Sequence, residues 1–139
     1  MARTTTMPPS TRRQALHHPL RFPTIVLLIV AGAAHIPVTP EHLKEAPYIG
    51  YLFLALTVVC FALALTLLRY DTPAVWAVVV AVSLAAVLTY LVSRMVALPE
   101  IADDVGNWTE PLGLLSITSE FAAAALGLVA LQSTRRTRR

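Results

Sequence analysis

The sequence predicts an all-α integral membrane protein, a bundle of four transmembrane helices, and three observations support this fold class. Of its 139 residues, 56% are hydrophobic and only 14% are charged, whereas soluble domains average roughly 25% charged residues. Four long apolar segments lack the alternation of membrane β-strands, and the charged residues gather at the segment ends. A chain of this size cannot hide so much apolar surface from water. This excludes a disordered chain, a disulfide scaffold and an ordinary soluble enzyme.

The N-terminal part of the chain predicts a tail followed by two spans. Residues 1–21 are polar and basic and show no apolar periodicity, so we expect a flexible cytoplasmic tail. The first span is predicted over residues 22–38, where Pro23 suits a first helical turn. With about 17 residues, this span is near the lower limit for crossing a bilayer. The second span is predicted over residues 48–68, which contain no charge.

Two further spans are predicted in the second half of the chain. The third covers residues 73–97 and begins at Asp71-Thr72-Pro73, an N-cap followed by a first-turn proline. The fourth covers residues 111–131, and residues 132–139 form a second basic cytoplasmic tail. Small residues four positions apart would let these helices approach a neighbour closely, in a compact bundle or a dimer. These residues are Ala77, Ala81 and Ala85 on the third span and Ala123 and Gly127 on the fourth.

The positions of the basic residues predict that both termini are cytoplasmic. Nine of the eleven lysines and arginines lie in the two tails and in the short turn 69–73. The longer loops, 39–47 and 99–110, contain six of the eight acids and only Lys44 among the basic residues. We therefore expect the two loops outside the membrane, where they form a cap over the bundle.

A second interpretation of the first apolar segment stays open. Basic residues, the apolar run 25–30 and the small residues 31–34 are together also typical of a signal peptide with its cleavage site. Cleavage would leave three spans that start outside and end inside. The charge distribution therefore does not decide between the two interpretations.

Two charged residues lie within the predicted spans, where ionisable groups are costly and often functional. Glu120 is nine residues beyond Pro111, which places it about 13 Å deep at a rise of 1.5 Å per residue. A carboxyl group at that depth is expected to be protonated or to lie beside a cation. The functional interpretation is a proton-responsive or cation-binding group. The structural alternative is a carboxyl group bonded to a neighbouring helix.

Other polar residues could surround Glu120. Arg94, near the outer end of the third span, is expected to pair with Glu120 or with a loop carboxylate, or else to extend outward to water. Tyr90 is one turn before Arg94 on the same face and matches Glu120 in depth. Ser116 is one turn from Glu120 and could hydrogen-bond it.

The outer loops contain a second set of candidate residues. Imidazole and carboxylate groups suit a divalent transition metal such as zinc, copper(II) or iron(II). An acidic solvated loop surface is the alternative, because the predicted topology alone keeps basic residues inside, and no H-E-x-x-H or clustered-cysteine spacing is present. The candidate ligands are His35, His42, Glu41, Asp103 and Asp104.

Loop structure and membrane anchors can also be predicted. Residues 40–46 are expected to form a short interfacial helix with Thr39 as N-cap, and its Leu43 should point inward. Trp108 and Tyr48 fit an aromatic belt at the membrane interface.

The stretches AHIPVTPEHLKEAPYIG and SRMVALPEIADDVGNWTEPLG lie in an Ala/Val/Leu-rich chain with four apolar segments. In this the chain resembles small, functionally uncharacterised inner-membrane proteins of high-GC bacteria. The resemblance covers most of residues 22–131. It implies a bacterial plasma membrane protein and implies no activity.

The leading functional hypothesis is a non-enzymatic accessory or ligand-sensing membrane subunit, as a homo-oligomer or in a larger membrane complex. Its acidic, histidine-containing cap would bind a partner or a small ligand. The alternative is a metal- or proton-handling protein that uses the external histidines and acids together with Glu120. An enzyme is less favoured, because no activated nucleophile, Gly-rich phosphate loop or pair of catalytic carboxylates is recognisable. Apart from a divalent metal no cofactor is expected, and no nucleic acid, because no basic patch is interleaved with aromatic residues.

Overall fold

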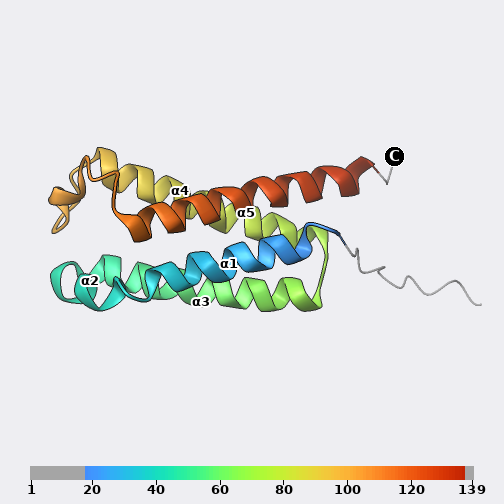
Figure 1. The fold of residues 1–139 in the computed structure, drawn as a ribbon, viewed down its shortest axis with the longest axis horizontal. Helices are drawn as coiled ribbons and strands as arrows, with labels where there is room; N and C mark the ends of the chain where they lie inside the picture. Colours follow the sequence, from blue (N-terminus) through green and yellow to red (C-terminus); the bar gives the residue numbers. More distant parts are fainter. Residues whose placement is uncertain (1–17, 137–139) are drawn as a thin grey trace, which may run out of the picture.

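The computed structural model describes residues 18–136, which contain only helices, turns and loops and no strand (Figure 1). The all-helical fold class is confirmed. The long helices are separated by a short helix and by a single 3-10 turn, η1. In chain order the elements are α1 Arg21–His35, α2 Thr39–Glu45, α3 Pro47–Arg69, α4 Pro73–Met95, η1 Ala102–Asp104 and α5 Pro111–Arg136.

Three of the described helices, α3, α4 and α5, are long and apolar enough to cross a membrane. The pair α1 and α2 meets the same test when taken together, although the two are bent by 45° relative to each other. The structure therefore has three candidate spans, or four if the bent pair counts as one. Either number indicates a membrane protein.

The first helix is shorter than the predicted span 22–38, because it ends at His35. Residues 36–38 are apolar enough to continue the hydropathy pattern, but they include Pro37, and Pro40 follows them. Proline lacks a backbone N–H, and its ring conflicts with the carbonyl four residues earlier, which is that of Ala33 for Pro37 and that of Ile36 for Pro40. A straight helix therefore cannot continue, and the chain bends before α2.

The short helix predicted over residues 40–46 is present one residue earlier, as α2. The prediction of Thr39 as its N-cap is wrong, since Val38 occupies that position without a side-chain cap. The Thr39 hydroxyl instead donates to the carbonyl of His35 at 2.7 Å, which ties α2 to the end of α1. Leu43 does point inward, and it packs so closely on Gly50 of α3 that a Cβ there would lie 2.6 Å from Leu43 Cγ.

The turn between α3 and α4 contains the cap predicted within Asp71-Thr72-Pro73. Thr72 is the N-cap of α4, and its side chain accepts from the N–H of Val75. The Asp71 carboxylate accepts from the indole Nε1–H of Trp76 at 2.6 Å and from the backbone N–H of His18 at 2.7 Å. A fully buried indole N–H needs an acceptor. Asp71 is the acceptor for Trp76, and Thr72 caps the N-terminus of α4.

The helices pack as two pairs, α1 with α3 and α4 with α5, and α1 also contacts α5 (Figure 1). Contact between α3 and α4 is slight, although they are consecutive in the chain. The start of α1, the turn 70–72 and the end of α5 share one end of the bundle, here called the turn end. The opposite end, here called the loop end, contains α2 and the loop 96–110.

Only part of the small-residue pattern lies between helices. Ala123 and Gly127 of α5 are buried, and a Cβ on Gly127 would lie 2.7 Å from Val80 Cγ2 of α4. Close approach of helices at this position is therefore confirmed. The row on α4 is exposed on the single chain and does not pack against another helix there; it consists of Ala77, Ala81 and Ala85.

Candidate functional site

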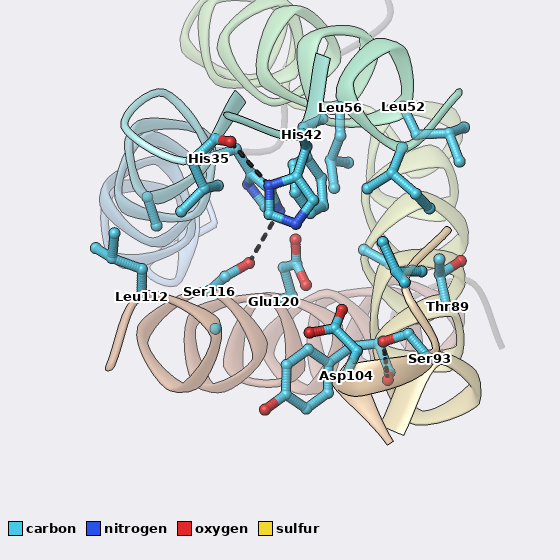
Figure 2. A pocket seen from close by; sticks show the side chains of 18 of the residues that line it. His35, His42, Leu52, Leu56, Thr89, Ser93, Asp104, Leu112, Ser116 and Glu120 are labelled. Carbon is cyan, nitrogen blue, oxygen red and sulfur yellow. Dashed lines mark hydrogen bonds between the residues drawn. The ribbon is translucent and has the colours of Figure 1, made fainter. Parts of the chain in front are cut away.

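A cavity of about 330 Å³ lies between α3 and α4 toward the loop end (Figure 2). It exists where these two helices fail to pack closely. Side chains of α5, α1 and α2 complete its lining with Ser116, Glu120, His35 and His42. Its walls on α3 and α4 are apolar over most of their length and include Leu52, Leu56, Val59, Val82, Ala85 and Ala86.

Glu120 is the most deeply placed acid of this cavity. It is only 3% exposed, and its carboxyl group points from α5 into the cavity, toward His42 and His35 (Figure 2). Within residues 18–136, its Oε1 atom has no hydrogen-bond partner. A buried polar atom without a partner costs about 1–3 kcal/mol, and this oxygen shares that state with Tyr90 Oη and Arg94 Nε of the same lining.

His35 is bonded on both ring nitrogens. Its Nδ1 lies 2.7 Å from the carbonyl of Ala31 and therefore carries the proton. Its Nε2 then accepts from the Ser116 hydroxyl at 3.3 Å. In His42, Nδ1 donates to the carbonyl of Val38 at 2.9 Å. These bonds fix both imidazoles in orientation without using Glu120.

The two imidazoles also share one aromatic neighbour. The ring centroids of His35 and His42 lie 5.0 and 4.9 Å from that of Phe53. Phe53 of α3 thus contacts both histidines. Nothing in the sequence distinguishes Phe53 from an ordinary lipid-facing residue, and it was not among the predicted site residues.

Arg94 forms a second polar group, the Arg94 cluster, with Tyr90, Asp104 and Glu110. Its side chain is 5% exposed, with Nη1 2.6 Å from Asp104 Oδ1 and Nη2 3.0 Å from Glu110 Oε2. Its guanidinium carbon lies 4.8 Å from the centre of the Tyr90 ring. Arg94 was expected to pair with Glu120 or with a loop carboxylate. It pairs with two loop carboxylates and not with Glu120.

The Arg94 cluster joins α4 to the loop that follows it. Arg94 Nη1 also donates to the Asp104 carbonyl at 3.3 Å, and the Gly106 N–H donates to the Arg94 carbonyl at 3.0 Å. Gly113 leaves the room that this cluster needs, because a Cβ there would lie 2.9 Å from Glu110 Oε2. Glu110 was not singled out from the sequence, although an acid next to the first residue of a span is a signal that could have found it.

The five candidate metal ligands are not brought together. His35, His42 and Asp104 line the cavity, whereas Glu41 and Asp103 are exposed and lie outside its lining. Over the described part of the chain, no group of three or more histidines, cysteines and acids is arranged to hold a metal ion.

The two predicted interface residues lie at the loop end. The Tyr48 hydroxyl donates to the Pro99 carbonyl at 2.6 Å and so links the start of α3 to the second loop. Trp108 is 43% exposed and packs edge-on against Tyr90, with 6.4 Å between ring centroids. Both residues therefore support the loop that covers the cavity.

No protein-family model, curated protein or solved structure matches this chain. Its function must therefore be inferred from the cavity itself. Apolar walls with a few convergent polar groups are typical of small-molecule sites, and the volume is at the lower end of their range.

Proposed function

We propose that the protein crosses the bacterial plasma membrane four times, with α1 and α2 together as the first span and both termini in the cytoplasm. The 15 residues of α1 reach about 22 Å at 1.5 Å per residue, less than the roughly 30 Å of hydrocarbon. The bent continuation into α2 supplies the remaining depth. Arg21 and Arg69 at the turn end support the orientation, as do the acidic residues of the loop end.

Cysteine labelling tests this topology, because Cys60 is the only cysteine of the chain. In a Cys60→Ala background, Glu45→Cys places a thiol at the loop end and Tyr70→Cys places one at the turn end; both positions are exposed. A membrane-impermeant maleimide should label Glu45→Cys on intact cells and Tyr70→Cys only after lysis. Labelling of Tyr70→Cys on intact cells would contradict the orientation.

We propose further that the protein binds a small amphipathic molecule in its cavity, as a non-enzymatic ligand-sensing or accessory membrane subunit. One observation carries this proposal: a cavity with apolar walls contains a carboxyl group that is 3% exposed and has an unpartnered oxygen. Buried polar groups in folded proteins are nearly always hydrogen-bonded. A ligand with a polar end would supply the missing partner, while its apolar body fills the space between α3 and α4.

The test is to fill the cavity. Leu56→Trp adds a large ring to the cavity wall, whereas Leu65→Trp adds the same ring to a position of α3 that is 63% exposed. Binding to protein in lipid nanodiscs is measured by titration calorimetry with three six-carbon probes: hexyltrimethylammonium, 1-hexanol and hexanoate. Empty nanodiscs give the background from partition into lipid.

We expect at least one probe to bind the wild type saturably with one site per chain. Leu56→Trp should weaken this binding about tenfold or more, since an overfilled pocket excludes the apolar body, and Leu65→Trp should leave it unchanged. If Leu56→Trp binds the probes as the wild type does, or if no probe exceeds the empty-nanodisc background, the ligand-binding function is wrong.

A further inference from the structure

We infer that the molecule bound in the cavity is an amphipathic cation, an alkyl or aryl amine or quaternary ammonium compound whose charged group rests on Glu120. This inference deepens the proposed function and depends on it. It follows from the charges of the cavity, from the partners already assigned to each charged group, and from the shape of the apolar walls.

The charged groups that line the cavity are unbalanced. They comprise one arginine and three carboxylic acids, namely Arg94, Asp104, Glu110 and Glu120. Arg94 is already committed to two of these acids, at 2.6 and 3.0 Å. Glu120 is therefore the acid of the lining that has no cation beside it.

The histidines do not fill that role. Among the residues that the structure describes, the ion pairs are the two of Arg94, and neither His35 nor His42 forms one with Glu120. Both nitrogens of His35 already have partners, in Ala31 and Ser116. Any positive charge next to Glu120 therefore comes from outside these residues.

The surroundings of Glu120 favour a cation attached to an apolar body. Charge attraction is much stronger in an apolar, poorly hydrated site than in water, and a hydrogen bond that involves an ionised group is about twice as strong as a neutral one. The walls formed by Leu52, Leu56 and Val82 offer the body apolar contact. A ligand with a negative end would instead be repelled by Glu120, the one acid of the lining that Arg94 does not neutralise.

The three probes of the proposed-function experiment also test this inference. Hexyltrimethylammonium carries a fixed positive charge, 1-hexanol is neutral and hexanoate is negative, while their alkyl chains are the same. In wild-type nanodiscs, we expect hexyltrimethylammonium to bind about tenfold or more tightly than either of the others.

A matched pair of variants locates the preference. Glu120→Gln keeps the size of the side chain and removes its charge, and should weaken hexyltrimethylammonium binding about tenfold or more. Glu45→Gln makes the same change at an exposed acid outside the cavity and should bind as the wild type does. Circular dichroism confirms that both variants retain wild-type helical content. If Glu120→Gln does not fold, the comparison of probes on the wild type decides alone.

The outcomes separate this inference from the proposed function. If 1-hexanol or hexanoate binds as tightly as the cation, or if folded Glu120→Gln binds the cation as the wild type does, the cation inference is overturned. The ligand-binding function then still stands, provided that Leu56→Trp weakens binding. Absence of saturable binding by all three probes overturns both.

Discussion

The turn end and the loop end are formed by the same long helices, but the space between the helices is used differently at each. At the turn end apolar side chains fill it: Trp76 and Val79 are 0% exposed and Leu28 is 1% exposed. At the loop end α3 and α4 separate, and the space remains as a cavity with polar groups. Close packing at one end supplies stability, so the other end can retain a site that does not pack fully.

Two buried acids make the contrast sharper. Asp71 at the turn end is 1% exposed and Glu120 toward the loop end is 3% exposed. Asp71 accepts two hydrogen bonds, from Trp76 and from His18, whereas Glu120 has an oxygen without a partner among the described residues. Burial alone therefore does not separate the two acids. The unsatisfied oxygen of Glu120 is what makes it the candidate for binding a ligand.

The largest effect on stability is expected from Arg94→Gln, which tests whether the loop end is held by charge. The substitution leaves Asp104 and Glu110 without their cation. Loss of a fully buried pair costs 3–5 kcal/mol; since these acids are 24% and 34% exposed, we expect the free energy of unfolding to fall by about 2 kcal/mol. Unfolding in SDS, followed by circular dichroism, measures this change.

Arg69→Gln is the matched control at the turn end, because Arg69 is an exposed arginine at the end of a long helix. We expect a change within about 0.5 kcal/mol there. Limited proteolysis adds a local readout, since cleavage within the loop 96–110 should accelerate in Arg94→Gln alone. Equal effects of the two substitutions would show that the Arg94 cluster does not hold the loop end together.

The helices could largely be predicted from the sequence, because hydropathy and proline both mark their limits. Pro73 and Pro111 begin α4 and α5 as predicted, and α3 begins at Pro47, one residue before the predicted start. The end of α1 could not be predicted from hydropathy, because residues 36–38, which follow the last residue of α1, are as apolar as the helix itself. The cap predicted at Thr39 is wrong, since its hydroxyl bonds the backbone carbonyl of His35 instead.

The site could be predicted only in part. Glu120 and Arg94 stand out in the sequence because a charge inside an apolar segment is visible at once. Their partners do not, since the sequence gives the depth of a residue along a helix but neither the rotation of that helix nor the path of a loop. The pairing of Glu110 with Arg94 was therefore not predicted. His35 was expected in an outer loop, but it lies in α1 and contacts Ser116.

The smallest effects come from paired glycine substitutions in α5, which probe the packing at each end. A Cβ on Gly127 would lie 2.7 Å from Val80 Cγ2, a methyl group of a stiff β-branched side chain. A Cβ on Gly113 would lie 2.9 Å from Glu110 Oε2, at the end of a flexible side chain, and 3.0 Å from Tyr90 Cε2. Alanine stabilises a helix by about 1 kcal/mol relative to glycine. In each substitution this gain in stability is opposed by the close contacts of the added Cβ atom.

At Gly127 the crowding should prevail, because overpacking costs about 1–3 kcal/mol, and Gly127→Ala should lower the free energy of unfolding by about 1 kcal/mol. At Gly113 the Glu110 carboxylate can move, so Gly113→Ala should leave that free energy within about 0.5 kcal/mol of the wild type. SDS unfolding of both variants under one set of conditions measures the difference. A larger loss for Gly113→Ala than for Gly127→Ala would mean that the loop end is packed as rigidly as the turn end, and that its cavity has no freedom to adapt to a ligand.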